Sequence, residues 1–197
     1  YAPYFAAAFE PGDAISIDNA AKAIAAYERT QITPGSAYDR YVQGDKTALT
    51  AQQLSGMNAF AEAGCQACHS GAAFAGPALP MGTPFLQKFP LNADSPYVAK
   101  YDLMTDKGRF ESTKDPADEH MWRVPQLRNL THTAPYLHNG SVKTLQETVR
   151  LMASVQLGKD LPPADVENIA AFLTSLTGEF PKEMLPRLPP TPGDLLK

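Results

Sequence analysis

The sequence lacks the features that would place it in several common classes of protein. Only two of its 197 residues are cysteines, which excludes a framework of several disulfides. No apolar run approaches the ~20 residues that a membrane-spanning helix needs. The net charge of −4 is mild and argues against a nucleic-acid-binding surface. With 44% hydrophobic and 19% charged residues, the composition is that of an ordinary globular domain with a real core.

The two cysteines that are present lie close together and are followed directly by a histidine, in the run Cys65-Gln66-Ala67-Cys68-His69. This C-x-x-C-H pattern is the attachment sequence of a c-type haem. Each thiol can bond one vinyl group of the haem, and the histidine is then placed to bind the iron through Nε2. A zinc site would need two more ligands at matching spacing, and a thioredoxin-type pair expects a βαβ setting that this chain lacks. We therefore predict one covalently bound haem c.

The haem motif also predicts where the protein works. Covalent attachment of haem takes place outside the cytoplasm, so we expect a periplasmic protein whose leader has been removed. The chain starts in an apolar pattern with Tyr4, Phe5 and Phe9 near helical spacing, whereas processed secretory proteins usually start in a loose polar stretch. This start favours a piece of a longer protein over a complete chain.

Capping residues and apolar periodicity predict two helices before the haem motif. Ser16 can cap a helix over about residues 17–31. Thr50 and Gln53 form a capping box that opens a second helix, which ends near Gly64. The residues of this second helix that we expect to face inward are Leu54, Met57, Phe60 and Ala61.

The same signals predict two helices near the end of the chain. Thr144 and Glu147 form a second capping box, and Pro162-Pro163 precedes the last helix, with Gly178 as its expected stop. The apolar residues of the last helix recur at helical spacing and are Val166, Ile169, Ala170, Leu173 and Leu176.

One glycine and two aromatic residues indicate how the first and last of the helices around the haem meet. In a class I cytochrome c, a small residue lets these two helices cross closely beside an aromatic contact. Gly56 lies four residues before Phe60, and Phe172 is on the last helix. We interpret Gly56 as the crossing point, although a glycine can also be tolerated in a helix at a cost of about 1 kcal/mol.

The rest of the chain shows little periodicity. Residues 70–120 are rich in glycine and proline and form an irregular stretch longer than most structureless loops. The predicted fold is therefore mostly α-helical: a class I cytochrome c-like haem domain over residues 1–180 with a long irregular segment that wraps the haem. A proline-rich tail over residues 181–197 should be extended.

The residue pattern leaves the second axial ligand of the haem iron open. A methionine there raises the reduction potential and favours electron transfer, whereas an open position admits substrate. Any single methionine is more often core filler than ligand. Spacing alone leaves Met81, Met104, Met121 and Met152 as candidates, in competition with His120, His132 and His138.

Several segments resemble the bacterial dihaem cytochrome c peroxidases and their MauG relatives. The densest runs from Trp122 to Gly140 and contains Val-Pro-Gln-Leu-Arg-Asn and Pro-Tyr-Leu-His-Asn-Gly. Further segments lie at residues 23–30, 38–45, 108–110, 152–158 and 172–179. The resemblance covers nearly all of the chain to about residue 180 and corresponds to the C-terminal haem domain of the family.

That resemblance implies an electron-transfer haem with histidine and methionine ligands. The family's methionine falls at Met152, where MauG proteins carry tyrosine, so the chain resembles the peroxidases more closely. The family also places a calcium between its two haem domains, to which backbone carbonyls at the positions of Thr133 and Pro135 contribute. Calcium needs about 6–8 oxygen ligands, so this chain would supply only part of the site.

The resemblance further implies a division of labour. The peroxidatic haem and its catalytic acid belong to the family's N-terminal haem domain, which this sequence does not contain, so we expect no catalysis from the chain alone. Its expected role is to pass electrons from a small donor protein, a cytochrome c or a cupredoxin, to the haem that reduces hydrogen peroxide. Homodimers are common in the family. The alternatives are a stand-alone electron carrier and a haem-based sensor whose Met152 leaves to admit a ligand.

Overall fold

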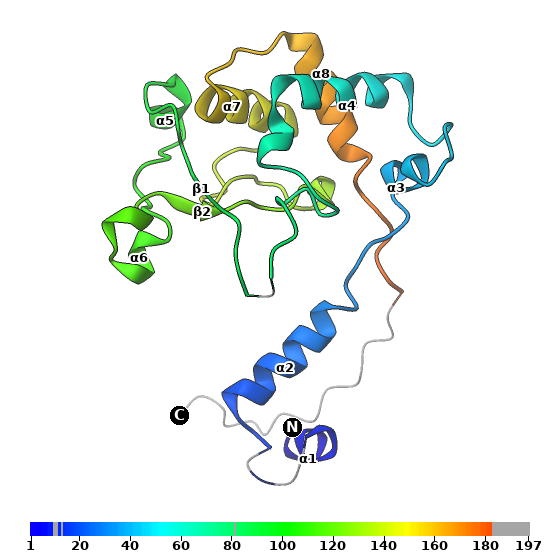
Figure 1. The fold of residues 1–197 in the computed structure, drawn as a ribbon, viewed down its shortest axis with the longest axis vertical. Helices are drawn as coiled ribbons and strands as arrows, with labels where there is room; N and C mark the ends of the chain where they lie inside the picture. The colour runs from blue at the N-terminus through cyan, green and yellow to red at the C-terminus, as the bar shows by residue number, and fades with distance from the viewer. Residues whose placement is uncertain (10–11, 13, 81, 183–197) are drawn as a thin grey trace. The chain divides into compact units, whose positions relative to one another are not determined.

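The computed structural model describes residues 1–9, 12, 14–80 and 82–182. The chain separates into two compact units, one made of residues 1–34 with the segment from 179 onward and the other of residues 35–178 (Figure 1). The proline-rich tail lies outside the described residues from position 183. No helix among the described residues is long and apolar enough to cross a membrane.

The first unit contains two helices, α1 (Ala2–Ala8) and α2 (Ile17–Glu28). Ser16 caps α2 as predicted, because its hydroxyl accepts a hydrogen bond from the backbone N–H of Asn19. The helix ends at Glu28, three residues before the predicted limit. Neither helix has a buried residue.

The second unit contains the haem motif and all of the candidate ligands that the structure describes. Its first half contains α3 (Ala37–Val42), α4 (Ala51–Ala63), the 3₁₀ helix η1 (Cys65–Ala67), the strand β1 (Leu86–Lys88), α5 (Pro96–Lys100) and α6 (Phe110–Thr113). Its second half contains η2 (Pro116–Asp118), the strand β2 (Met121–Arg123), η3 (Leu130–His132), α7 (Leu145–Leu157) and α8 (Pro163–Thr174).

The two predicted capping boxes are not equally complete. At α4 both halves are present: the Thr50 hydroxyl accepts from Gln53 N, and the Gln53 side chain accepts from Thr50 N. At α7 the Thr144 hydroxyl accepts from Glu147 N. The Glu147 carboxylate instead accepts from the Tyr101 hydroxyl at 2.6 Å and from Lys100 at 2.7 Å. A residue that the pattern assigned to local capping therefore joins α7 to α5.

The predicted crossing of α4 and α8 is confirmed (Figure 1). Gly56 lies at the contact. A Cβ atom added to Gly56 would lie 1.8 Å from the backbone oxygen of Asn168 and 2.9 Å from Cβ of Phe172. No other side chain fits there without moving one helix. The expectation for Ala61 was wrong, because this residue is exposed; the buried residues of α4 are Gly56, Phe60 and Ala63.

The apolar side chains form two clusters. The first cluster gathers around the helix crossing and consists of Phe60, Phe74, Leu145, Val149, Val166, Ile169, Ala170, Phe172, Leu173 and Leu176. All five periodic residues predicted for α8 and the turn after it belong to it. The second cluster consists of Phe89, Leu103, Val142, Leu151 and Val155. It joins α7 to the irregular part of the chain.

The irregular segment contains a short antiparallel sheet that the sequence pattern did not indicate. Strands β1 and β2 pair with Leu86 opposite Arg123 and Lys88 opposite Met121. Each strand has only three residues, too few to establish an alternating pattern. The predicted class is confirmed at the level of a mostly helical protein consistent with a cytochrome c-like fold.

Candidate haem-binding site

The haem motif begins at the end of α4. Gly64 ends the helix in the left-handed conformation (φ 97°), which favours glycine and turns the chain sharply. Residues Cys65–Ala67 then form one 3₁₀ turn, and His69 N donates to the carbonyl of Cys65 at 2.9 Å. Both thiols and the imidazole are thereby held on one tight turn, as attachment to a single haem requires.

The two cysteines are unpaired and half-buried. Burial raises the pKa of the Cys65 thiol to about 11. Redox-active C-x-x-C pairs need a thiolate and depend on a lowered pKa. Nor do the described residues contain a group of three or more His, Cys, Asp or Glu side chains that could hold a metal ion. Both findings disfavour the thioredoxin and zinc alternatives and fit haem, since a porphyrin supplies four nitrogens of its own.

His69 is oriented by the backbone that follows the motif. Its Nδ1 lies 3.0 Å from the carbonyl oxygen of Phe74, and the carbonyl of Pro125 also contacts the ring. Burial lowers the pKa of His69, so the ring is neutral at neutral pH. With the proton on Nδ1 and donated to Phe74, Nε2 would be the nitrogen that binds iron. Such a hydrogen bond fixes the tautomer and the ring orientation of a metal-binding histidine.

Phe74 is itself held firmly. It is buried, and its ring packs against those of Tyr38, Phe60 and Phe172 at centroid distances of 5.2–6.4 Å. Its backbone is in the left-handed region (φ 53°), which is uncommon for a bulky residue and is maintained by the surrounding contacts. Phe74 therefore anchors the loop between His69 and Gly76 to the first cluster. This packing fixes the backbone of Phe74, whose carbonyl oxygen faces His69.

Met152 lies in the middle of α7, half-buried against the second cluster. Cys65 packs against the first cluster. The predicted attachment point of the haem and the methionine predicted to bind its iron therefore lie against different hydrophobic clusters. Of the competing methionines, Met104 is 41% exposed and Met121 is in β2. Met81 lies outside the described residues.

Three buried polar atoms have no hydrogen-bond partner among the described residues: His120 Nδ1, Trp122 Nε1 and Ser141 Oγ. Trp122 packs against the second cluster, as Met152 does, and its ring stacks on His138 at 4.2 Å. Burial lowers the pKa of His138, so its ring also favours the neutral form. Buried donors of this kind normally have a partner, and haem carboxylates are groups of matching chemistry.

The residues predicted for calcium lie on an exposed turn. Thr133 ends η3, and Pro135 follows a cis peptide bond with Ala134. Both residues are exposed on the surface of the unit, and the calcium assignment stays a prediction.

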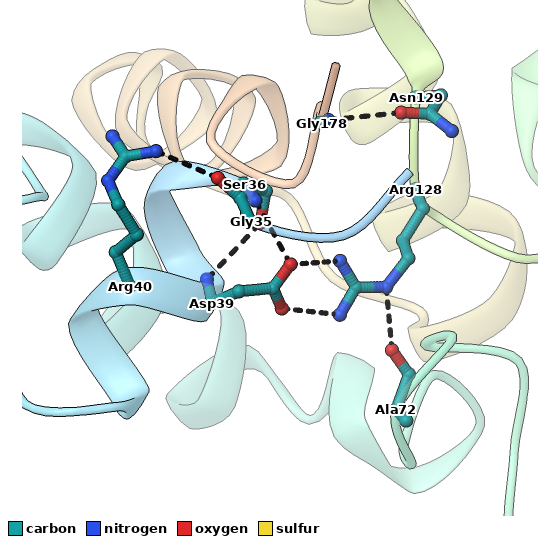
Figure 2. A network of polar contacts seen from close by, with 8 residues as sticks. All are labelled: Gly35, Ser36, Asp39, Arg40, Ala72, Arg128, Asn129 and Gly178. Carbon is teal, nitrogen blue, oxygen red and sulfur yellow. Dashed lines mark hydrogen bonds and ion pairs between the residues drawn. The ribbon is translucent and has the colours of Figure 1, made fainter. Parts of the chain in front are cut away.

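One ion pair joins two of the segments that resemble the family, residues 38–45 and residues 122–140, and no sequence pattern had indicated it. Arg128 and Asp39 join the segment after β2 to α3 (Figure 2). The pairing depends on side chains 89 residues apart, which a single sequence cannot bring together.

A hollow of about 580 Å³ lies beside the two-stranded sheet. It is lined by Leu86, Asp106, Gly108, Arg109, Glu111, Met121, Trp122 and Arg123. None of the four predicted haem residues belongs to this lining.

The fold and the C-x-x-C-H turn define a c-type haem protein, and comparison with known proteins gives the family. A family model described as di-haem cytochrome c peroxidase matches residues 1–47. The cytochrome c551 peroxidase of Pseudomonas aeruginosa is 46% identical over 190 residues, 96% of this chain and 52% of that protein. The cytochrome c peroxidase Ccp of Escherichia coli is 40% identical over 83% of this chain and 33% of that protein.

A MauG-like protein associated with microbial copper homeostasis has a similar solved structure. It gives a TM-score of 0.64 at 27% identity, over 84% of this chain and 58% of that one. The chain belongs to the family of di-haem cytochrome c peroxidases and MauG proteins. It spans about half the length of the first curated relatives that it matches. Membership of this family implies haem c as the cofactor.

Proposed function

We propose that this chain is the electron-transfer haem domain of a di-haem cytochrome c peroxidase, and that it passes electrons to a second haem where hydrogen peroxide is reduced. The observation that carries the proposal is the C-x-x-C-H turn, with two unpaired thiols and a neutral histidine whose Nδ1 is engaged. The identity to peroxidases over almost the whole chain supports it.

In this proposal, Cys65 and Cys68 would hold the haem through thioether bonds, and His69 and Met152 would bind its iron. The haem supplies one-electron exchange at its iron. The protein excludes water from the ring, holds the His69 proton on Nδ1 and fixes both ligands. A methionine ligand leaves no open position for peroxide and favours electron transfer.

The working context follows from the same proposal. A small periplasmic cytochrome c or cupredoxin donates the electrons, and a second haem domain accepts them. The carbonyls of Thr133 and Pro135 contribute to a calcium site completed by that domain, and the full protein works as a homodimer. The irregular segment over residues 70–120 wraps the haem.

The first test concerns the cofactor. Acid–acetone extraction of the haem-loaded chain should leave the colour on the polypeptide, and Cys65→Ala/Cys68→Ala should release it. Met152→Ala should abolish the weak ferric absorption band that marks sulfur ligation of haem iron, whereas Met121→Ala and Met104→Ala should keep it. Loss of the band in one of the control variants instead would contradict the assignment of Met152.

The second test concerns activity. The reduced chain should exchange electrons rapidly with a small cytochrome c and show negligible steady-state turnover of hydrogen peroxide. Sustained turnover by the chain alone would mean that Met152 is not a fixed ligand. Rapid exchange with no transfer to a second haem domain would favour the stand-alone carrier.

A further inference from the structure

Arg128 forms a two-pronged ion pair with Asp39 inside the second unit. Its two terminal nitrogens donate to the two carboxylate oxygens at 2.8 and 3.1 Å. The side chains are only 19% and 17% exposed, so the pair is largely protected from solvent. This fork geometry fixes the guanidinium in orientation as well as in position.

The remaining nitrogen of the same guanidinium, Nε, reaches the loop that follows the haem motif. Arg128 Nε donates to the carbonyl of Ala72 at 2.7 Å, as Figure 2 shows. The backbone N–H of Leu127 donates to the next carbonyl, that of Ala73, at 3.3 Å. Two successive peptide groups of the loop are therefore held by two successive residues of the segment after β2.

The next carbonyl along this loop is the one that orients the histidine. Phe74 O lies 3.0 Å from His69 Nδ1, and Phe74 N donates to Gly71 O at 3.0 Å. The ring of Phe74 is fixed in the first cluster, and the peptides before it are fixed by residues 127 and 128. The direction of the Phe74 carbonyl is thus set from both sides.

Asp39 is anchored in turn by the start of α3. Ser36 N donates to the Asp39 carboxylate at 3.1 Å, and the buried Ser36 hydroxyl accepts from Asp39 N at 3.2 Å. Burial works to raise the pKa of Asp39, but the hydrogen bonds from Arg128 and Ser36 hold it below its usual value. The carboxylate is therefore ionised and immobile at neutral pH.

We propose that Arg128 and Asp39 are positioning residues for the axial histidine, acting through the carbonyls of Ala72 and Phe74. The inference rests on the proposed role of His69 as an iron ligand. A hydrogen bond at Nδ1 makes the imidazole a more basic ligand, which stabilises ferric iron and lowers the reduction potential. Loosening the loop should weaken this bond and raise the potential.

The experiment uses variants of the haem-loaded chain that separate geometry from charge. Arg128→Lys keeps the charge but cannot bond both Asp39 oxygens and the Ala72 carbonyl at once. The double variant Arg128→Gln/Asp39→Asn removes both charges and leaves the net charge unchanged. Arg40→Lys is the matched control. Arg40 is exposed on α3, the helix of Asp39, and it also donates to a carbonyl, that of Gly35 at 2.8 Å.

Two readouts report on the histidine itself. One is the reduction potential, and the other is the solvent exchange rate of the His69 Nδ1 proton, measured by NMR in the reduced state. We expect the potential to rise and the proton to exchange about tenfold faster in both Arg128 variants, the factor for losing one charge-assisted hydrogen bond. The Arg40 control should match wild type in both.

Unchanged potentials and exchange rates alongside a lower Tm would overturn the inference, because the pair would then only stabilise the fold. A further variant, Arg128→Gln alone, changes the net charge. A shift in this variant that is absent in Arg128→Lys and in the double variant would also overturn the inference, since charge alone would explain the shift. Failure of the proposed function is seen earlier, in wild type, as a haem that is not covalent or a His69 that does not bind it.

Discussion

The two hydrophobic clusters of the second unit are built from different kinds of structure. The first cluster is formed mainly by α4, α7 and α8, whose buried residues recur at helical spacing. The second combines two residues of α7 with Phe89, Leu103 and Val142, which lie outside regular helices and strands.

The two regions also differ in whether their buried polar groups have hydrogen-bond partners. Around the first cluster the buried Ser175 hydroxyl donates to Phe172 O at 2.6 Å. The three buried polar atoms without a partner in the described residues are all between positions 120 and 141, in β2 and in the loops before and after it. Of these three atoms, Trp122 Nε1 belongs to a side chain that packs against the second cluster.

The strongest way to break the first cluster is Gly56→Ala. Alanine normally stabilises a helix interior by about 1 kcal/mol relative to glycine. Here its Cβ would overlap the backbone of α8, and we expect a loss of about 3 kcal/mol in the free energy of unfolding. Denaturant unfolding measures the loss, with the exposed Ser55→Ala on the same helix as control. Equal or greater stability of Gly56→Ala would mean that the helices do not cross at this glycine.

The next effect concerns the ion pair of Asp39 with Arg128, which joins α3 to the segment after β2. The pKa of Asp39 in the folded state lies below its unfolded value of about 3.9. Its contribution, about 1–2 kcal/mol, should therefore be full above about pH 5 and lost as pH falls through the folded pKa.

The check is the stability of wild type and Asp39→Asn from pH 7 to pH 2. The difference between them should shrink as the pH falls. The exposed Asp45→Asn serves as control and should give a smaller difference. A difference that stays constant with pH would show that the charge of Asp39 contributes nothing.

A smaller effect on stability is expected from replacing one buried serine in each of the two regions. Ser175→Ala removes a buried hydrogen bond and should cost about 1 kcal/mol, whereas Ser141→Ala removes a buried hydroxyl that has no partner among the described residues and should be neutral or stabilising. Thermal unfolding of both variants without haem measures this contrast. If Ser141→Ala becomes destabilising once haem is bound, the hydroxyl has acquired a partner there.

The smallest expected effect is the link from α5 to α7. A double-mutant cycle with Tyr101→Phe and Glu147→Gln should give a coupling of about 1 kcal/mol or less. The exposed pair of Lys114 and Glu111 serves as reference, and its coupling should be closer to zero. Equal couplings would mean that Glu147 adds nothing beyond an ordinary surface contact.

The sequence by itself determined the haem motif and the helical core. Caps, helical periodicity and the glycine at the crossing are local signals, because the groups that interact are within a few residues or repeat every turn. For that reason the sequence could predict α4, α8, the role of Gly56 and the C-x-x-C-H turn. The spacing of this motif also indicates attachment of haem c rather than another use of the cysteines.

Only the tertiary structure decided the pairing of β1 with β2, the contact of Glu147 with α5 and the clamp of Arg128 on Asp39. Each joins residues that are 33 to 89 positions apart. Such contacts leave no periodic trace in one sequence, because their geometry depends on how the loops close around the core. The histidine of the motif could be identified from its neighbours in the chain, but the Phe74 carbonyl at its Nδ1 and the Arg128–Asp39 ion pair could not.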